Sequence, residues 1–192
     1  GTDLELFVNG ASQGTTTWSV NMNSTTATVI GGGRFSGSSV NAVIAGYIRD
    51  FRIVKSAVYT SAFTPPTTPL GAISNTSLLA CHLPYIADGS TNAYTITKAG
   101  NAQTVREGPY DNGEYTKDTH GGSHRFDGTN DYLSLPNNAQ YAVGSNAFTL
   151  EGWAYPNAIA DNSLFFGYYE TGSNQRSYGI MQTQSSSHFA IV

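Results

Sequence analysis

The stretch Gly46-Tyr47-Ile48-Arg49-Asp50-Phe51-Arg52-Ile53-Val54 decides the fold. Side chains alternate along it with a period of two, which predicts a β-strand with one face in a core. The residues of one parity are Tyr47, Phe51 and Ile53, and those of the other are Ile48, Asp50 and Arg52. Downstream, Pro65 and Pro66 have no N–H to donate to a sheet, so the Thr- and Pro-rich run around them predicts the end of a structural unit.

Turn signals divide the rest of the chain into short segments of strand character. Asn9-Gly10 follows an alternating run and is the strongest signal, because a two-residue hairpin turn needs positive φ at both positions. Further strands are expected at residues 11–20, 26–30, 78–83, 94–97, 132–135, 148–153, 164–169, 177–181 and 188–192. Only residues 57–63 suggest a helical turn. The pattern predicts an all-β protein, an antiparallel β-sandwich of the jelly-roll type.

The composition excludes several classes of function. Charged residues make up 11% of the chain, and its net charge is -4. Binding to a phosphate backbone requires a cluster of basic residues, and the sequence has none, so no nucleic-acid partner is expected. No apolar run approaches the roughly 20 residues of a membrane helix, so no membrane insertion is expected. Cys81 is the only cysteine, which excludes an internal disulfide, and its apolar neighbours predict a buried, inert thiol.

Several motifs carry a family resemblance. Residues 46–66 (GYIRDFRIVKSAVYTSAFTPP) resemble the closing strand and tail of laminin-G-like domains of the concanavalin A-like lectin/glucanase superfamily, as found in bacteriophage and marine microbial surface proteins. Later segments resemble the opening of such a domain, in the family's order: 77–83 (SLLACHL), 87–92 (ADGSTN), 123–133 (SHRFDGTNDYL) and 148–153 (FTLEGW). The resemblance implies a concanavalin A-like jelly roll. It does not select a function, since this fold hosts lectins, adhesins, spacers and hydrolases.

The order of these motifs predicts an unusual domain organisation. Residues 1–70 look like the C-terminal part of one laminin-G-like sandwich, 71–77 like a linker, and 78–192 like the N-terminal part of another. Two alternatives stay open. Either each part pairs with segments outside these residues in a tandem-repeat chain, or the two parts complement each other as one permuted domain.

A glycoside hydrolase needs two carboxylates that face a sugar cleft. The superfamily's hydrolases commonly carry Glu-x-Asp-x-x-Glu or Glu-x-Asp-x-Glu on one strand, and no such run occurs. Glu151 stands alone on its strand, and Trp153 is expected in the core. Asp50 is flanked by Arg49 and Arg52, which predicts an ionised carboxylate rather than a general acid. We therefore expect no catalytic residue and no enzyme activity, with a hydrolase as the least favoured alternative.

Two loops supply the oxygen ligands that Ca²⁺ requires. They contain Asp88, Asn92, Asp127, Asn130 and Asp131. Domains that resemble this one often hold a structural ion at their loops, so calcium is the only cofactor considered, with Asp88, Asn92, Asp127 and Asp131 as candidate ligands. Neither loop alone has enough carboxylates. The alternative is that Asp and Asn simply build the turns.

Sugar binding without catalysis requires an aromatic platform beside polar groups that bind hydroxyls. Tyr168, Tyr169, Asn174 and Arg176 supply these groups in and beside one loop, and Trp18 is a further candidate. Core packing is the competing explanation for one of the two tyrosines, because neighbours in a strand face opposite sides.

Together these observations predict a non-catalytic structural or adhesion module of a phage virion, such as a tail, fibre or capsid-associated protein. Its expected location is the virion surface or the extracellular space. The expected partners are a host surface glycan, other virion proteins or copies of itself. The main alternative is an architectural spacer without a ligand.

Overall fold

The structure is a computed structural model of the 192-residue chain. It describes residues 2–18, 27–33, 39–40, 42–106, 108–110, 115–141, 143–158, 163–167, 179–183 and 188–191. The strands are β1 (Thr2–Val8), β2 (Ala11–Trp18), β3 (Thr28–Ile30), β4 (Ala45–Val54), β5 (Thr76–Ala80), β6 (Thr97–Ala99), β7 (Gln103–Val105), β8 (Ser123–Asp127), β9 (Tyr132–Leu135), β10 (Thr149–Pro156), β11 (Ser163–Gly167), β12 (Gly179–Thr183) and β13 (His188–Ile191). The helical elements are α1 (Lys117–His120) and the 3-10 turn η1 (Ala139–Tyr141).

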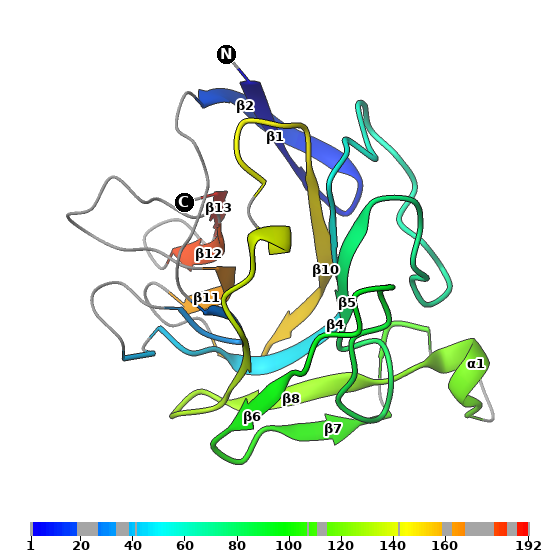
Figure 1. The fold of residues 1–192 in the computed structure, drawn as a ribbon, viewed down its shortest axis with the longest axis vertical. Coiled ribbons are helices and arrows are strands. Elements are labelled where there is room, and N and C mark those ends of the chain that lie inside the picture. Colours follow the sequence, from blue (N-terminus) through cyan, green and yellow to red (C-terminus); the bar gives the residue numbers. More distant parts are fainter. Residues whose placement is uncertain are drawn as a thin grey trace.

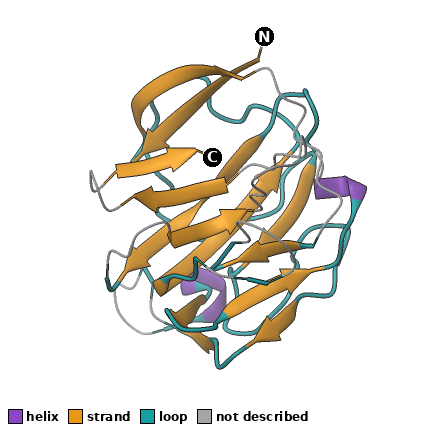
Figure 2. Cartoon of the chain, turned by 90° about the vertical axis from the view of Figure 1, so that its left-hand side faces the viewer, coloured by secondary structure: helices purple, strands orange, loops and turns teal. Residues whose placement is uncertain are grey.

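The all-β prediction is confirmed. All strand pairs in the described residues are antiparallel, and helix is limited there to two short turns (Figure 2). The helical turn predicted at residues 57–63 is wrong. Two backbone amides of this segment form hydrogen bonds to other segments instead: Val58 donates to Thr149 Oγ1 and Phe63 to the Gly10 carbonyl. None of the helices that the structure describes has the length and apolar character to cross a membrane.

The strands form a hairpin and two larger sheets (Figure 1). The first, here named the β4 sheet, has the order β10-β4-β8-β7, with β5 also paired to β4. The second, the β3 sheet, has the order β13-β12-β11-β3-β9-β6. Strands β3 and β4 precede residue 70, yet they pair with strands that follow residue 75. Both predicted parts of the chain therefore share both sheets, which is the arrangement of the permuted alternative, while the domain division itself stays a prediction.

Strand β4 is the centre of its sheet, as the opening stretch predicts, but its alternation breaks at Asp50. In the pairing of β4 with β10, Arg52 lies opposite Glu151 and Arg49 opposite Trp153. Two residues of β4, Asp50 and Phe51, therefore lie opposite the single residue Gly152. Asp50 has φ 50°, and this extra residue makes a β-bulge. The bulge shifts the parity of the strand. Ile48, Phe51 and Ile53 pack in the core, and the expected alignment of Tyr47 with Phe51 and Ile53 is wrong.

The two larger sheets share one hydrophobic core. Phe51 of the β4 sheet packs on Phe166 of the β3 sheet, with ring centroids 4.1 Å apart. Phe126, Ile30, Leu133 and Leu135 belong to the same cluster and are fully buried. Cys81 is also buried there, as predicted, and burial raises the pKa of its thiol. The opposite face of the β4 sheet, here named its outer face, carries Arg49 and Arg52. Residues of the segments 57–71, 108–110 and 115–122 partly cover it.

Candidate functional site

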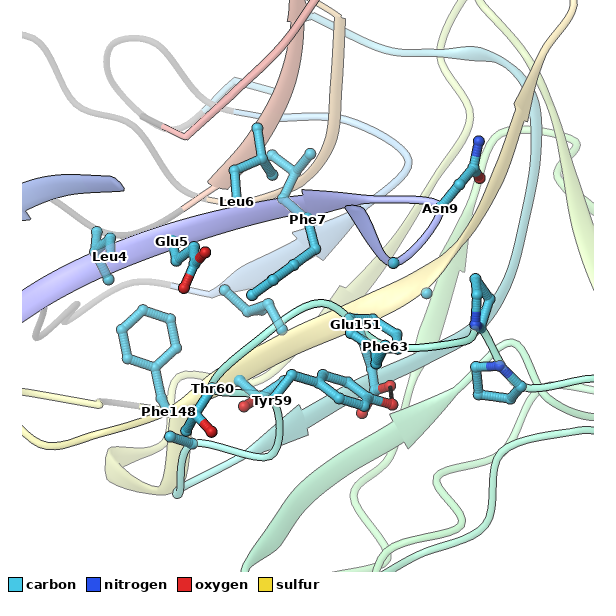
Figure 3. A pocket seen from close by; sticks show the side chains of 18 of the residues that line it. Leu4, Glu5, Leu6, Phe7, Asn9, Tyr59, Thr60, Phe63, Phe148 and Glu151 are labelled. Atoms are coloured by element: carbon cyan, nitrogen blue, oxygen red, sulfur yellow. Dashed lines mark hydrogen bonds between the residues drawn. The ribbon is translucent and has the colours of Figure 1, made fainter. Parts of the chain in front are cut away.

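A pocket of about 430 Å³ lies between β1, β10 and the segment that follows β4 (Figure 3). The hairpin β1–β2 stands beside β10 without strand pairing to it, and the segment 57–66 fills part of the space between them. The beginning of β12 contributes Gly179 and Ile180. Segments that are far apart in the sequence therefore build this concave surface.

Aromatic rings form one wall of the pocket. Tyr59 and Phe63 stack with centroids 3.7 Å apart and an interplanar angle of 8°. Phe7 of β1 meets Phe63 edge-on at 5.5 Å. Phe148 and Trp153 line the pocket from the β10 side. Trp153 is half-buried on the outer face, so its predicted place in the core is wrong. The wall offers flat apolar surface to a ligand ring.

A charged network lies beside these rings. Arg52 Nε donates to Glu151 Oε1 (2.8 Å), and Arg52 Nη2 forms an ion pair with the same oxygen (2.6 Å). Tyr59 Oη donates to Glu151 Oε2 (2.8 Å). Arg52 Nη1 also donates to the Gly71 carbonyl at 2.6 Å. Burial, and then the hydrogen bond to Glu151, raise the pKa of Tyr59 to about 12, so its hydroxyl remains a donor at neutral pH. Both oxygens of Glu151 are thus occupied, which gives this carboxylate a positioning role.

The hairpin turn is fitted to the aromatic wall. Asn9 and Gly10 have φ values of 52° and 78°, which confirms the predicted two-residue turn. Phe63 N donates to the Gly10 carbonyl at 3.0 Å. A Cβ at Gly10 would lie 1.8 Å from the Phe63 carbonyl oxygen. Glycine therefore allows both the turn and the close approach of Phe63.

We expect Gly10→Ala to lower the free energy of unfolding by about 1–3 kcal/mol, because the new Cβ meets backbone and the φ is positive. Urea denaturation followed by circular dichroism measures this loss. Gly14→Ala is the matched control, since Gly14 also has positive φ (129°) in the same hairpin but nothing lies within 4 Å of its added Cβ. Equal losses in both variants would contradict the proposed contact between the turn and Phe63.

The residues predicted to bind sugar lie mostly outside the described part. Tyr168, Tyr169, Asn174 and Arg176 are outside the described residues, so that site stays a prediction. Trp18 ends β2 opposite Thr2, and only its backbone is described. The pocket residues Phe7, Tyr59, Phe63 and Phe148 were not predicted from the sequence. Tyr59 and Phe63 could have been found, because they lie between the predicted strand and Pro65-Pro66 and are therefore two large rings outside any strand.

The predicted calcium ligands serve as turn builders in the structure. Asp88 Oδ1 accepts hydrogen bonds from the amides of Leu79 and Ser90, and its Oδ2 accepts from the amide of Tyr94. Asn92 Nδ2 donates to the Ser77 carbonyl.

The second loop uses its acids in the same way. Asp131 accepts from the amides of Asn101 and Asp127, and Asp127 accepts from Thr129. Within the described ranges, no three His, Cys, Asp or Glu side chains form a group that could hold a metal ion. The calcium site stays a prediction, and these bonds favour the turn-building alternative, because an ion would have to displace them.

A buried polar cluster lies where β4 bulges. Asp50 is fully buried, 3.6 Å from the Arg49 guanidinium, and accepts a hydrogen bond from the amide of Leu70. Burial raises the pKa of Asp50 to about 6 despite Arg49, so the expectation that the flanking arginines control its ionisation is wrong. The second flanking arginine, Arg52, is bound to Glu151 instead. Desolvation outweighs the single neighbouring charge.

Arg49 is enclosed almost completely. It lies under the ring of Tyr110, with 4.5 Å between the guanidinium carbon and the ring centroid, and Trp153 Nε1 donates to Tyr110 Oη at 2.5 Å. A Cβ at Gly108 would lie 1.7 Å from Arg49 Nη1. Within the described residues, Arg49 is 2% exposed and Asp50 is fully buried, so we assign the pair a structural role.

His124 is buried on the core side of β8, opposite Ile48. Neither of its ring nitrogens has a hydrogen-bond partner among the described residues. Burial, and then the nearby His82, lower the pKa of His124 to about 4. His124 is therefore a neutral core side chain.

Comparisons of the chain with family models, with curated proteins and with solved structures found no significant match.

Proposed function

We propose that the chain is a non-catalytic carbohydrate-binding module with the concanavalin A-like jelly-roll sandwich of laminin-G-like domains. The proposal of this fold rests on the sequence motifs together with two antiparallel sheets that share one core. The pocket between β1 and β10 is its binding site. The observation that carries the proposal is the combination of stacked rings with fixed polar groups around one concavity, which is the chemistry that sugar rings and hydroxyls require.

The setting we propose is a phage tail, fibre or capsid-associated protein that binds a host surface glycan. This setting comes from the family resemblance. Many copies on one particle would raise avidity even where each pocket binds weakly. The spacer without a ligand and the hydrolase are the competing functions.

The hydrolase is the second candidate because the acids Asp3, Glu5 and Glu151 all line the pocket. Two features favour binding over cleavage. Both Glu151 oxygens are occupied by Arg52 and Tyr59, and Asp3 accepts a hydrogen bond from Thr17 at 3.1 Å. A hydrolase needs one acid to protonate the leaving group and a second to attack or to activate water.

A glycan array with the folded chain tests the proposed function. We expect at least one glycan to bind, and Phe148→Leu to weaken that binding about five-fold to ten-fold, because leucine keeps apolar bulk but removes the ring. Tyr85→Ala is the control, since Tyr85 is a half-exposed aromatic residue that does not line the pocket. Absence of binding by folded protein would favour the spacer. Release of shorter sugars, abolished by Glu5→Gln or Glu151→Gln, would favour the hydrolase.

A further inference from the structure

Four side chains lie in one line across the outer face of the β4 sheet. The register pairs Tyr155 of β10 with Tyr47 of β4, Tyr47 with Arg125 of β8, and Arg125 with Gln103 of β7. Residues directly opposite in antiparallel strands point to the same side of a sheet. The adjacent Ile48 is in the core. The row of Tyr155, Tyr47, Arg125 and Gln103, here named the outer row, therefore faces away from the core.

The outer row is open. Tyr155 is 70% exposed, the largest value among the exposed large hydrophobic side chains of the described residues. Gln103 is also exposed, while Tyr47 and Arg125 are half-buried. The rings of Tyr47 and Tyr155 lie 6.2 Å apart at 59°. Three strand spacings of about 4.8 Å give the row a length of roughly 14 Å, which suits several sugar units better than one.

The outer row continues the surface of the pocket. Trp153 lines the pocket, and Tyr155 is the next residue of β10 that points to the same side. A chain of sugars that leaves the pocket along β10 would therefore meet Tyr155 first and then Tyr47. The pocket and the row differ in charge: the pocket is lined by acids, whereas the row contains one cation and no acid.

The chemistry of the row indicates the kind of sugar. Tyrosine rings offer apolar faces, and the Gln103 amide can bind hydroxyls. The guanidinium of Arg125 has the planar pair of donors that matches a carboxylate. Asp127 lies two residues further on the same face of β8, but its Oδ1 accepts a hydrogen bond from the amide of Thr129 within its own turn.

We propose that the outer row extends the pocket into a binding surface for an extended oligosaccharide whose units are neutral in the pocket and carry a carboxylate beside Arg125. This inference rests on the proposed function for its class of ligand, and it adds the length and the charge of that ligand. An oligosaccharide of neutral units that ends in a uronic acid fits both features: its rings lie on Tyr155 and Tyr47, and its one carboxylate pairs with Arg125.

Isothermal titration with cellobiose, cellohexaose and a cellohexaose that is oxidised to a glucuronate at one end tests the proposal. The oxidised hexamer is expected to bind at least five-fold more tightly than either of the other two. Tyr155→Ala is expected to weaken binding of the oxidised hexamer about five-fold and to leave cellobiose binding unchanged. Arg125→Gln is expected to remove the preference for the oxidised hexamer over cellohexaose. Tyr85→Ala, which replaces an exposed tyrosine outside the row, is the control.

The outcomes separate this inference from the proposed function. Equal affinity for cellobiose and the oxidised hexamer, or an unchanged affinity for the oxidised hexamer in Tyr155→Ala, would overturn the outer row. The pocket would remain the proposed binding site in that case if Phe148→Leu weakened binding. Binding of cellohexaose that is as tight as that of the oxidised hexamer, or tighter, would overturn the assignment of charge. Failure of all three sugars to bind folded protein overturns the outer row as a uronate site, and the glycan array then decides the proposed function.

Discussion

Phe126→Ala is expected to lower the free energy of unfolding by about 4 kcal/mol, within the range of 3–5 kcal/mol typical of such deletions. Phe126 is fully buried on β8 and packs against Gly31, the residue that follows β3. A Cβ at Gly31 would lie 2.4 Å from the Phe126 ring, so the ring packs tightly against the backbone there. Truncation leaves a cavity between the β4 sheet and the β3 sheet.

Chemical denaturation followed by circular dichroism and by tryptophan fluorescence measures this loss. Both probes are expected to report one transition, because the two sheets share a core. Tyr155→Ala is the matched control: it truncates an aromatic residue of the same sheet that is 70% exposed, and we expect a change within about 0.5 kcal/mol. A loss below about 1 kcal/mol for Phe126→Ala would contradict the shared core.

The second large effect is a pair of opposite pH dependences at Asp50 and His124. The folded pKa of Asp50 is raised from 3.8 to about 6, so the folded state resists ionisation and loses about 3 kcal/mol as the pH rises from 3.8 to 6. The folded pKa of His124 is lowered from 6.5 to about 4, so the folded state loses about 3 kcal/mol as the pH falls from 6.5 to 4. The two effects oppose each other between pH 4 and 6.

Single variants separate these contributions. The stability of Asp50→Asn relative to the unsubstituted chain is expected to rise by about 3 kcal/mol as the pH rises from 4 to 7, because asparagine cannot ionise. Asparagine also tolerates the positive φ at this position. The stability of His124→Gln relative to the unsubstituted chain is expected to rise by about 3 kcal/mol as the pH falls from 7 to 4, because glutamine cannot be protonated in this range. Urea denaturation of each variant and of the unsubstituted chain at each pH measures these differences in the free energy of unfolding. A packing effect of the substitution is the same at every pH, so it does not alter the change with pH. Differences that do not change with pH would contradict the burial of these groups.

Much of the architecture was predictable because it depends on local patterns. Alternation identified β4 as a strand, and Asn9-Gly10 identified the hairpin through its two positive φ values. The parity of β4 was not predictable, because a single bulge at Asp50 exchanges the two faces of a strand. The same bulge explains why Asp50 is buried beside Arg49 while Arg52 reaches Glu151 on β10.

The candidate site was less predictable, since it depends on tertiary contacts. Phe7, Tyr59 and Phe148 come from three separate segments, and no local pattern indicates that they meet. The ion pair of Arg52 and Glu151 joins residues that are 99 positions apart. The outer row likewise depends on the register of four strands, so Tyr155 and Arg125 look unrelated in the sequence.

The central claim is that the pocket between β1 and β10 binds a sugar through its aromatic rings without cleaving it. Saturation-transfer NMR on a bound glycan, with spectra taken at once and after a day, tests both parts together. We predict transfer from the aromatic protons to the sugar, weaker transfer in Phe148→Leu, and an intact glycan in the later spectrum. Absence of transfer with folded protein, or the appearance of shorter sugars, would contradict the account.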